Sequence, residues 1–412
     1  MIIYYKYKYY NYIVLTTFVL SVFFINLSIE YAKYQELIHE EIYESKVEVQ
    51  NIYEKENYDV LKLKNKNFTI FTNFDKNTQV LKYDILNLAF ITIDITFIDF
   101  LKGFYVKSVY FDKLEKKDGF SSRLIDYTTS QHHNEMIQEL FSALFFAKPI
   151  SKELREVCTN YGISHLIALS GFHLAVLSFI IYGIVYYPYA FFHLRYFPYR
   201  NKRFDILLIT LALLFFYLIF TGFVASLTRA FVMMAMGIYL LRCNIKLFSF
   251  TTLFIVLAFV LSLFPKYIFS LSLWFSIFGV FYIFLYIQYF KDIKNKLLHL
   301  LLFNFWIYLA MNPLVHYFFP LTTYEQMLSP FVTMAFTLFY PLELFAHIFS
   351  FGGFLDEYIL MFLSYEFKPF DKITSLWFLL IFMFFSFYSI FNKKAFYLLN
   401  ILLFAFTVYL YI

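Results

Sequence analysis

A polar stretch in the first half of the chain carries the side chains that are most unusual for so apolar a sequence. Residues 162–174 contain His165, His173 and the pair Ser170-Gly171, but no formally charged residue. On one continuous helix the two histidines would lie about 80° apart, because each residue turns the helix by about 100°. Polar groups at membrane depth need partners or a water-filled path. The stretch therefore predicts the lining of a polar conduit or, alternatively, a helix contact through Ser170-Gly171 with hydrogen-bonded histidines.

Arg229 is the second candidate for a functional residue. It follows an uncharged run, 206–228, and precedes another, 230–241, while Ser226 lies three residues before it. An arginine within a membrane helix is by default a functional residue, and its planar guanidinium matches the geometry of phosphate. The alternative is that Arg229 lies at the outer end of its helix and extends to the lipid headgroups.

Sequence patterns for catalysis or cofactor binding are absent. The nine histidines form no His-x-His or His-Glu-x-x-His pattern, and the chain contains no Cys-x-x-Cys. Ser170 is not part of a Gly-x-Ser-x-Gly elbow, and no Gly-rich loop with Lys-Ser/Thr could hold phosphates. His132 and His133 form a bare pair in a polar segment, for which a solvated position is expected. We therefore expect a protein that is not an enzyme and that needs no metal or other cofactor.

The elements that must position these residues are those of a polytopic membrane protein. The chain has 412 residues, of which 61% are hydrophobic and 15% are charged. Soluble domains carry about 25% charged residues, and a single core stops growing near about 250–300 residues. Two cysteines cannot form a disulfide framework.

Apolar runs predict roughly nine or ten membrane segments. The first is an uncleaved helix at 13–29, whose N-terminus is expected in the cytoplasm because Lys6 and Lys8 precede it. Clusters of Lys and Arg at 195–203, 242–246 and 291–296 are expected on the same side. The later runs lie at 157–194, 206–228, 230–241, 247–264, 267–290, 297–324 with breaks at Asn312-Pro313 and Pro320, 326–342, 373–392 and 395–412.

Residues 31–133 differ in texture and predict a small β domain outside the cytoplasmic membrane. Apolar and polar residues alternate with period two at 46–49, 59–64, 68–71, 88–98 and 105–110, and turns are expected at 65–67 and 73–77. About five short strands suit a small closed barrel, of which the OB-fold is one kind. The insert carries slightly more acidic than basic residues, so a DNA-binding face would have to be local, around Lys62, Lys64 and Lys66.

The polar residues also carry a family resemblance. Residues 162–173, Gly-Ile-Ser-His-Leu-Ile-Ala-Leu-Ser-Gly-Phe-His, resemble the signature G-[LI]-x-H-L-[LI]-A-I-S-G-[LF]-H of the competence protein (ComEC) family. Residues 226–230, Ser-Leu-Thr-Arg-Ala, resemble that family's [ST]-x-x-R-A element. Segments at 265–276, 312–320 and 328–342 resemble its later elements more loosely, so that the resemblance covers roughly residues 45–345.

The resemblance implies an inner-membrane, multi-pass channel that passes single-stranded DNA into the cytoplasm during natural transformation. Its DNA path would include His165, Ser170, Gly171, His173, Ser226 and Arg229. The implied partners are single-stranded DNA, the lipid bilayer, a periplasmic DNA-binding protein and a cytoplasmic helicase or single-strand-binding protein, with self-association into a homo-oligomer. The chain has no His-x-His-x-Asp-His, so we expect the short form that lacks the metallo-β-lactamase-like domain of many relatives.

The resulting organisation has four parts. A transmembrane helix at 1–30 precedes the extracytoplasmic OB-fold-like domain at 31–133. The competence-type channel domain at 134–350 begins with an amphipathic segment at 134–159, and residues 351–412 form an interfacial segment and C-terminal helices. Two other functions stay open: a secondary transporter of a small solute, with a midplane site at broken helices, and a noncatalytic scaffold that binds an envelope partner.

Overall fold

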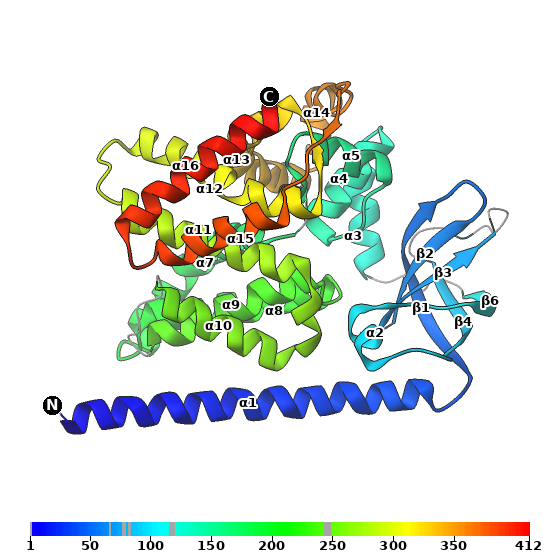
Figure 1. Cartoon of the computed structure of the whole chain (residues 1–412), viewed down its shortest axis with the longest axis horizontal. Coiled ribbons are helices and arrows are strands. Elements are labelled where there is room, and N and C mark those ends of the chain that lie inside the picture. Colours follow the sequence, from blue (N-terminus) through cyan, green and yellow to red (C-terminus); the bar gives the residue numbers. More distant parts are fainter. Residues whose placement is uncertain are drawn as a thin grey trace. The chain divides into compact units, whose positions relative to one another are not determined.

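The computed structural model describes residues 2–412 except 66, 76–79, 81–83, 115–119, 168 and 243–248, and it leaves the side chains of 2–13, 15, 54, 120, 121, 225, 226 and 240–242 undescribed. The chain divides into two compact units. One consists of Met1–Phe120 and Phe254–Leu273, and the other of Ser121–Leu253 and Trp274–Ile412. Figure 1 shows the long first helix and a sheet in the first unit and a helical bundle in the second.

The sheet forms where the alternating pattern predicts it. In β2, Leu61 and Leu63 are buried, while Lys62 and Lys64 between and after them lie on the other face. Six strands pair in the order β5-β3-β2-β1-β4-β6. They are β1 (Ile42–Glu54), β2 (Asp59–Lys64), β3 (Thr69–Phe74), β4 (Ile85–Ile91), β5 (Phe104–Tyr105) and β6 (Ser108–Leu114).

The prediction of a closed barrel is wrong. The edge strands β5 and β6 follow each other along the chain with only Val106 and Lys107 between them, and they do not pair with each other. Instead, β5 runs parallel to β3 at one edge, and β6 runs antiparallel to β4 at the other. The extended segment that contains β5 and β6 therefore links the two edges of the sheet through its backbone. Because β5 and β6 do not pair with each other, the sheet does not close into a barrel.

The predicted strand at 88–98 is also too long. Strand β4 ends at Ile91, and the apolar-polar alternation that follows leads into a short helix, α2 (Phe97–Lys102). Thr96 caps this helix by accepting from the amide of Asp99, and the Asp99 carboxylate accepts in return from the Thr96 amide. The hydrogen bonds from Thr96 hold the pKa of Asp99 below its usual value. A local capping box therefore overrides the strand pattern.

The first helix, α1 (Ile2–Ile38), packs its C-terminal end into the core of the sheet unit. Leu37 is buried in that core, and the Tyr34 hydroxyl donates to the carbonyl of Ile95 at 2.9 Å. Residues 254–273 belong to the same unit, where the Asn26 amide donates to the carbonyl of Ser262 at 2.9 Å. The Lys102 ammonium lies 5.0 Å from the ring centre of Phe269 in the 3-10 helix η1 (Pro265–Phe269).

The second unit is built from helices with short connections, and its boundary runs through the helix at 250–263, because residues 254–273 belong to the first unit. It begins with amphipathic helices where the sequence predicts an amphipathic segment at 134–159. The helices from α3 onward are α3 (Phe120–Thr129), α4 (Glu135–Phe146), α5 (Lys152–Asn160), α6 (Ser164–Ile167), α7 (Gly171–Tyr196), α8 (Lys202–Phe220), α9 (Ala225–Arg242), α10 (Phe250–Leu263), α11 (Leu271–Phe290), α12 (Lys296–Phe318), α13 (Ser329–Ile348), α14 (Asp356–Leu363), α15 (Leu376–Tyr388) and α16 (Lys393–Tyr411). Two 3-10 helices, η2 (Tyr324–Leu328) and η3 (Gly352–Leu355), and a strand pair, β7 (Leu321–Thr322) with β8 (Phe370–Asp371), complete it.

Among the described residues, six helical segments are long and apolar enough to cross a membrane. They are Gly171–Tyr196, Lys202–Phe220, Leu271–Phe290, Lys296–Phe318, Tyr324–Ile348 and Lys393–Tyr411, and shorter apolar helices lie at Leu227–Tyr239, Phe250–Leu263 and Leu376–Tyr388. The predicted first segment at 13–29 is helical throughout within α1.

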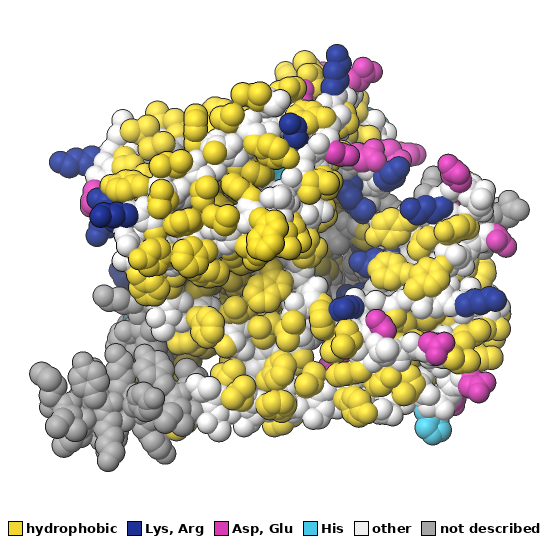
Figure 2. Space-filling view, viewed as in Figure 1, with side chains coloured by type: hydrophobic (Ala, Val, Ile, Leu, Met, Phe, Trp, Pro, Cys, Tyr) yellow, Lys and Arg dark blue, Asp and Glu magenta, His cyan; other side chains and the backbone are white. Residues whose placement is uncertain are grey.

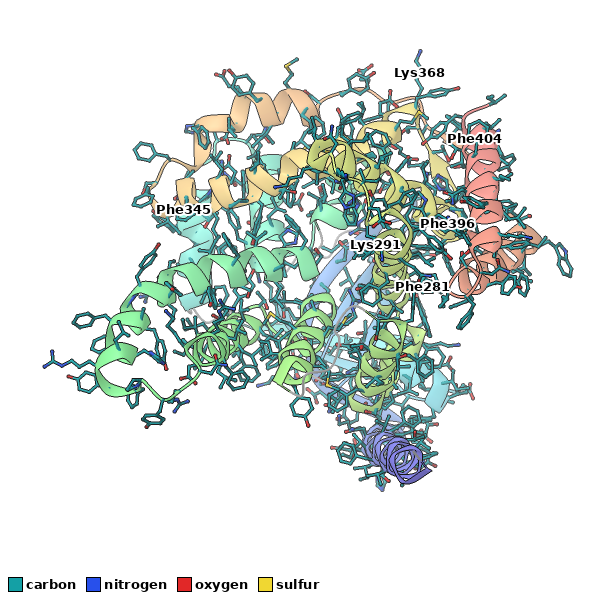
Figure 3. All side chains as sticks on the ribbon, turned by 90° about the vertical axis from the view of Figure 1, so that its left-hand side faces the viewer. Phe281, Lys291, Phe345, Lys368, Phe396 and Phe404 are labelled. Atoms are coloured by element: carbon teal, nitrogen blue, oxygen red, sulfur yellow. The ribbon has the colours of Figure 1, made fainter. Side chains whose placement is uncertain are left out.

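The surface of the helical unit has the apolar character that lipid requires. On the face drawn in Figure 2, hydrophobic side chains cover most of this unit and charged side chains gather at its margins. Figure 3 labels Phe345 and Phe404, which are exposed, and Phe281 and Phe396, which are buried between helices. Large aromatic side chains thus occur both inside and outside the bundle, as expected of a protein whose outer solvent is lipid.

Two predicted helix boundaries differ from the observed ones. The break at Asn312-Pro313 is wrong, because α12 continues through Pro313 and ends at Phe318, before Pro320. The run 206–228 is divided, because Gly222 and Phe223 adopt left-handed conformations (φ of 71° and 54°) that end α8. As a result, α9 begins at Ala225, and Arg229 lies inside this helix.

Candidate functional site

The polar stretch that carries the two candidate histidines is not one helix. A short helix, α6, contains His165, and a new helix, α7, begins at Gly171. Ser170 is the N-cap of α7, and its hydroxyl accepts from the amide of Phe172 at 3.3 Å. The polar stretch at 162–174 therefore contains a helix break at Ser170. The angle of about 80° between His165 and His173, which assumes one continuous helix, does not apply.

His173 completes the cap and is thereby held in one tautomer. Its Nδ1 accepts from the backbone amide of Ser170 at 3.2 Å and also lies 3.2 Å from the Ser170 hydroxyl. Because an amide N–H can only donate, Nδ1 must carry the lone pair, and the hydrogen of the neutral ring is on Nε2. The ring is 0% exposed, and its Nε2 has no hydrogen-bond partner among the described residues. His173 thus presents a buried N–H donor that has no acceptor among the described residues.

Both histidines reach the same neighbouring helix, α13. The ring of His173 lies against Tyr340 and Phe336, with ring centres 4.6 Å and 5.6 Å away. His165 is exposed, and its Nε2 lies 3.4 Å from the hydroxyl of Thr333. Thr333, Phe336 and Tyr340 follow the three-to-four spacing of one helix face. The structure therefore brings both histidines to one face of α13, although they come from different helices.

The helix that carries Arg229 meets α7 at the helix break. A Cβ added at Gly171 would lie 3.9 Å from the Cβ of Ala230, the residue after Arg229. Leu227 of α9 also packs in one buried cluster with Leu169 and Leu174, which flank the break. Arg229 itself is 6% exposed, which does not support the alternative in which it extends to the lipid headgroups. The two polar elements picked out from the sequence are thus in contact.

Ser226 lies in the first turn of α9, and its side chain is outside the described residues. Ala168, in the middle of the recognised motif, is also outside them. Of the six predicted residues, the structure therefore places His165, Ser170, Gly171, His173 and Arg229 on α6, α7 and α9.

The glycine that opens the motif holds a turn against α13. Gly162 has a φ of 68°, and a Cβ there would lie 3.4 Å from side-chain atoms of both Gln326 and Ser329. The Ser329 hydroxyl donates to the carbonyl of Gly162 at 3.0 Å, and the Gln326 amide donates to the carbonyl of Thr159 at 3.2 Å. The start of the motif is therefore fixed to residues 326–329, and the last two of these begin the segment 328–342 that resembles the competence family.

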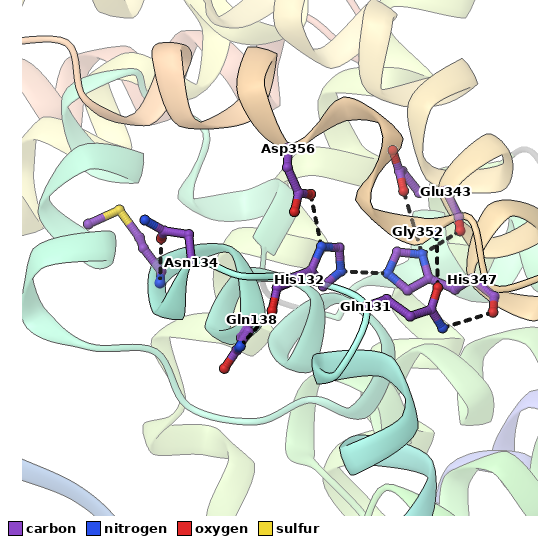
Figure 4. A network of polar contacts seen from close by, with 9 residues as sticks. Gln131, His132, Asn134, Gln138, Glu343, His347, Gly352 and Asp356 are labelled. Carbon is purple, nitrogen blue, oxygen red and sulfur yellow. Dashed lines mark hydrogen bonds and ion pairs between the residues drawn. The ribbon is translucent and has the colours of Figure 1, made fainter.

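A histidine that was expected at the solvated surface is buried. His132 is 3% exposed and contacts His347 and Asp356, as Figure 4 shows, whereas its neighbour His133 is exposed. The prediction was wrong for His132 because its partners are 215 and 224 residues away in the sequence. A bare His-His pair contains no local signal that distinguishes a buried ring from a solvated one.

In the sheet unit, two of the three predicted basic residues can be described. The Lys62 ammonium lies 5.9 Å from the ring centre of Phe71, its neighbour across the β2–β3 ladder. Burial lowers the pKa of the Lys64 ammonium, and the charge of Lys266 adds to this effect. Lys66 is outside the described residues.

Comparison with known proteins identifies the family. The profile of the family described as Competence protein matches residues 146–412. This range begins in α4 and includes the helix break at Ser170 and the Arg229 helix. No curated protein and no solved structure is significantly similar to the chain. The match covers more than half of the sequence, and the chain therefore belongs to the Competence protein family.

Proposed function

We propose that the chain is the channel through which single-stranded DNA enters the cytoplasm during natural transformation. The observation that carries the proposal is the contact between two polar elements inside the family-matched region, where Gly171 lies against the residue that follows Arg229. Membership of the Competence family suggests a role in DNA uptake. A buried arginine beside a helix break supports the proposal, since guanidinium binds phosphates.

The donors of the site suit a nucleic-acid backbone better than a neutral solute. The Nε2–H of His173 is a buried donor, and the Arg229 side chain supplies donors together with positive charge. Both are complementary to phosphate oxygens, which only accept hydrogen bonds. We place the channel in the cytoplasmic membrane as a multi-pass protein, with the sheet unit outside and acting with a periplasmic DNA-binding protein, and with a helicase or single-strand-binding protein on the cytoplasmic side.

The proposal is tested by following labelled DNA in a strain that lacks the gene. We expect label to accumulate in the periplasm while the cytosolic pool is lost, and reintroduction of the gene to restore the cytosolic pool. Unchanged pools in both compartments would reject the channel function. A loss from both compartments would favour the scaffold alternative, in which an earlier step of capture depends on this protein.

We also propose that the protein moves DNA without cutting it. The purified protein should leave duplex and single-stranded DNA intact in the presence of Mg²⁺, Mn²⁺ or Zn²⁺. Metal-dependent cleavage whose rate changes with a point substitution in this chain would reject the proposal.

The orientation is tested separately with a reporter that is active only in the cytoplasm. When fused near Lys116, between β6 and α3 in the sequence, the reporter should be silent. A control fusion in the basic connection at 197–201, between α7 and α8, should be active. Strong activity near Lys116 would place the sheet unit in the cytoplasm.

A further inference from the structure

Three segments of the helical unit meet in a chain of titratable side chains (Figure 4). His132 follows α3, His347 lies in the last turn of α13, and Asp356 begins α14. The carboxylate of Asp356 lies 2.8 Å from Nδ1 of His132. Nε2 of His132 in turn lies 2.8 Å from Nε2 of His347, and Nδ1 of His347 lies 2.7 Å from the backbone carbonyl of Glu343.

The chain is enclosed by close packing. His132 and His347 are 3% and 4% exposed. The ring of His132 stacks on Phe141 with centres 4.6 Å apart, and His347 contacts Phe141 and Phe145. Gly352 closes the remaining side, because a Cβ there would lie only 2.7 Å from Nε2 of His347. A substitution at this position, or a larger group between the rings, would require the surrounding backbone to move.

The hydrogen-bond partners fix how many protons the chain must hold. The carbonyl of Glu343 only accepts, so Nδ1 of His347 carries a hydrogen and its Nε2 carries a lone pair. If Asp356 is ionised, it also only accepts, and Nδ1 of His132 must donate to it. Two neutral rings would then present two lone pairs to each other across 2.8 Å, which is repulsive. The contact becomes a hydrogen bond only when one additional proton is present.

We propose that Asp356, His132 and His347 form a buried proton-binding site that fastens the residues before α4 to the end of α13. The additional proton makes this contact a hydrogen bond when it is on the Nε2 of His132 or on the Nε2 of His347. The same holds when it is on Asp356 and His132 adopts its other tautomer. In each case the three side chains together have zero net charge, which is the least costly charge to bury. The site rests on local geometry and is independent of the proposed DNA function.

Few of the groups that surround the pair can carry a charge. Glu343 is titratable, and its Oε2 lies 3.5 Å from Nδ1 of His347. Phe141 and Phe145 carry no charge, and His133 is exposed. The described residues contain no group of three His, Cys, Asp or Glu side chains that could hold a metal ion.

Loss of the proton should weaken the structure in a direction that can be measured. In the unfolded chain, histidines release their protons as the pH rises through about 6.5. The folded site retains one proton above that pH, so the folded state binds more protons and its stability must fall as the pH rises. A difference of one proton changes the unfolding equilibrium by up to about tenfold per pH unit.

The test measures the melting temperature of the full-length protein in detergent between pH 6.5 and 9. The wild type should lose stability across this range, whereas His347→Gln should lose less, because an amide can donate or accept and keeps the contact without an additional proton. His132→Gln is a second variant of the same kind. Asp356→Asn keeps the acceptor but removes the charge, so its loss should begin at lower pH. His133→Gln is the matched control and should follow the wild type.

Parallel pH profiles for the wild type and both Gln variants would overturn the proposal, as would an Asp356→Asn profile identical to that of the wild type. The same measurement with added Zn²⁺ or EDTA distinguishes a proton from a metal ion. The proton site predicts no effect of either addition. Stabilisation by Zn²⁺ that disappears in His347→Gln would instead identify a metal site and reject the proposal.

Discussion

Gly171 and Ala230 face each other where α7 begins and α9 passes, and a Cβ added at Gly171 would lie 3.9 Å from that of Ala230. This distance is an ordinary van der Waals contact, and Gly171 does not have a positive φ. Gly171→Ala should therefore be tolerated, with normal DNA entry. Gly171→Ile should separate the two helices and reduce transformation strongly at unchanged protein level. Equal activity of the two variants would show that the close approach does not matter.

Arg229→Ala should separate folding from transport. Arg229 is buried in the second turn of α9, and its replacement by the better helix former Ala should leave the protein inserted. DNA entry into the cytosol should fall at least about tenfold, the effect of about 1.4 kcal/mol on a rate, while periplasmic DNA persists. Arg229→Lys should restore entry only in part, because an ammonium lacks the planar fork. Normal transformation by Arg229→Ala would remove this residue from the DNA path.

His173 has two roles that can be separated by substitution. His173→Ala removes the acceptor for the Ser170 amide, which alone should cost about 0.5–2 kcal/mol, and the cavity left by the buried ring adds to this loss of stability. His173→Gln should recover most of this stability, since Gln at this position can complete a capping box. Both variants should reduce DNA entry, because both lack the ring N–H. The reduction should be smaller than for Arg229→Ala, because that variant loses a positive charge as well as hydrogen-bond donors. If Gln restores entry together with stability, the histidine serves only to cap the helix.

Gly162→Ala should destabilise the turn that joins the motif to α13. The residue has a φ of 68°, for which a side chain costs roughly 1–2 kcal/mol, and its new methyl group would contact Gln326 and Ser329. Gly183→Ala is the matched control, because Gly183 lies in α7 with open space around it. The melting temperature should fall for the first variant and stay level or rise for the second. A fall in both would indicate a general sensitivity to added methyl groups.

Cys158 should resist thiol reagents as long as the protein is folded. It is buried against α4 and α13, and burial raises the pKa of its thiol to about 12. The reactive thiolate is therefore scarce even at pH 9, and the protonated thiol is out of reach of a maleimide. In a Cys243→Ser background, mass spectrometry should find no labelling until denaturant is added. Rapid labelling of the native protein would show that the α4–α5 cluster opens.

The sequence predicts those parts of the molecule that depend on local patterns. Strand β2 has the predicted limits. Leu61 and Leu63 alternate with lysines, a pattern typical of a strand with one buried and one solvent-facing side. The alternation at 92–98 wrongly predicted a strand. Thr96 and Asp99, three residues apart, form a capping box that begins a helix there. Pro313 did not break α12, since the surrounding helices hold the segment helical.

The candidate site was only partly predictable for a related reason. The Ser170 cap and the contact between Gly171 and Ala230 occur at residues that the sequence singled out, because polar and small residues are rare in apolar runs. The pairing of His132 with His347 depends on the way that α3, α13 and α14 come together, which no neighbouring residue encodes. Composition and periodicity identify which side chains are unusual, but tertiary contacts decide which of them meet.

The unbroken course of α1 has a mechanical consequence for the sheet. The apolar run ends at Ile29, yet the helix continues for about another 13 Å, at about 1.5 Å per residue, to Ile38. This last part contains neither glycine nor proline, and Leu37 is embedded in the core of the sheet. The apolar run of α1 and the sheet therefore have no pivot between them within this helix. In the proposed topology, a tilt of α1 in the bilayer would rotate the sheet by the same angle.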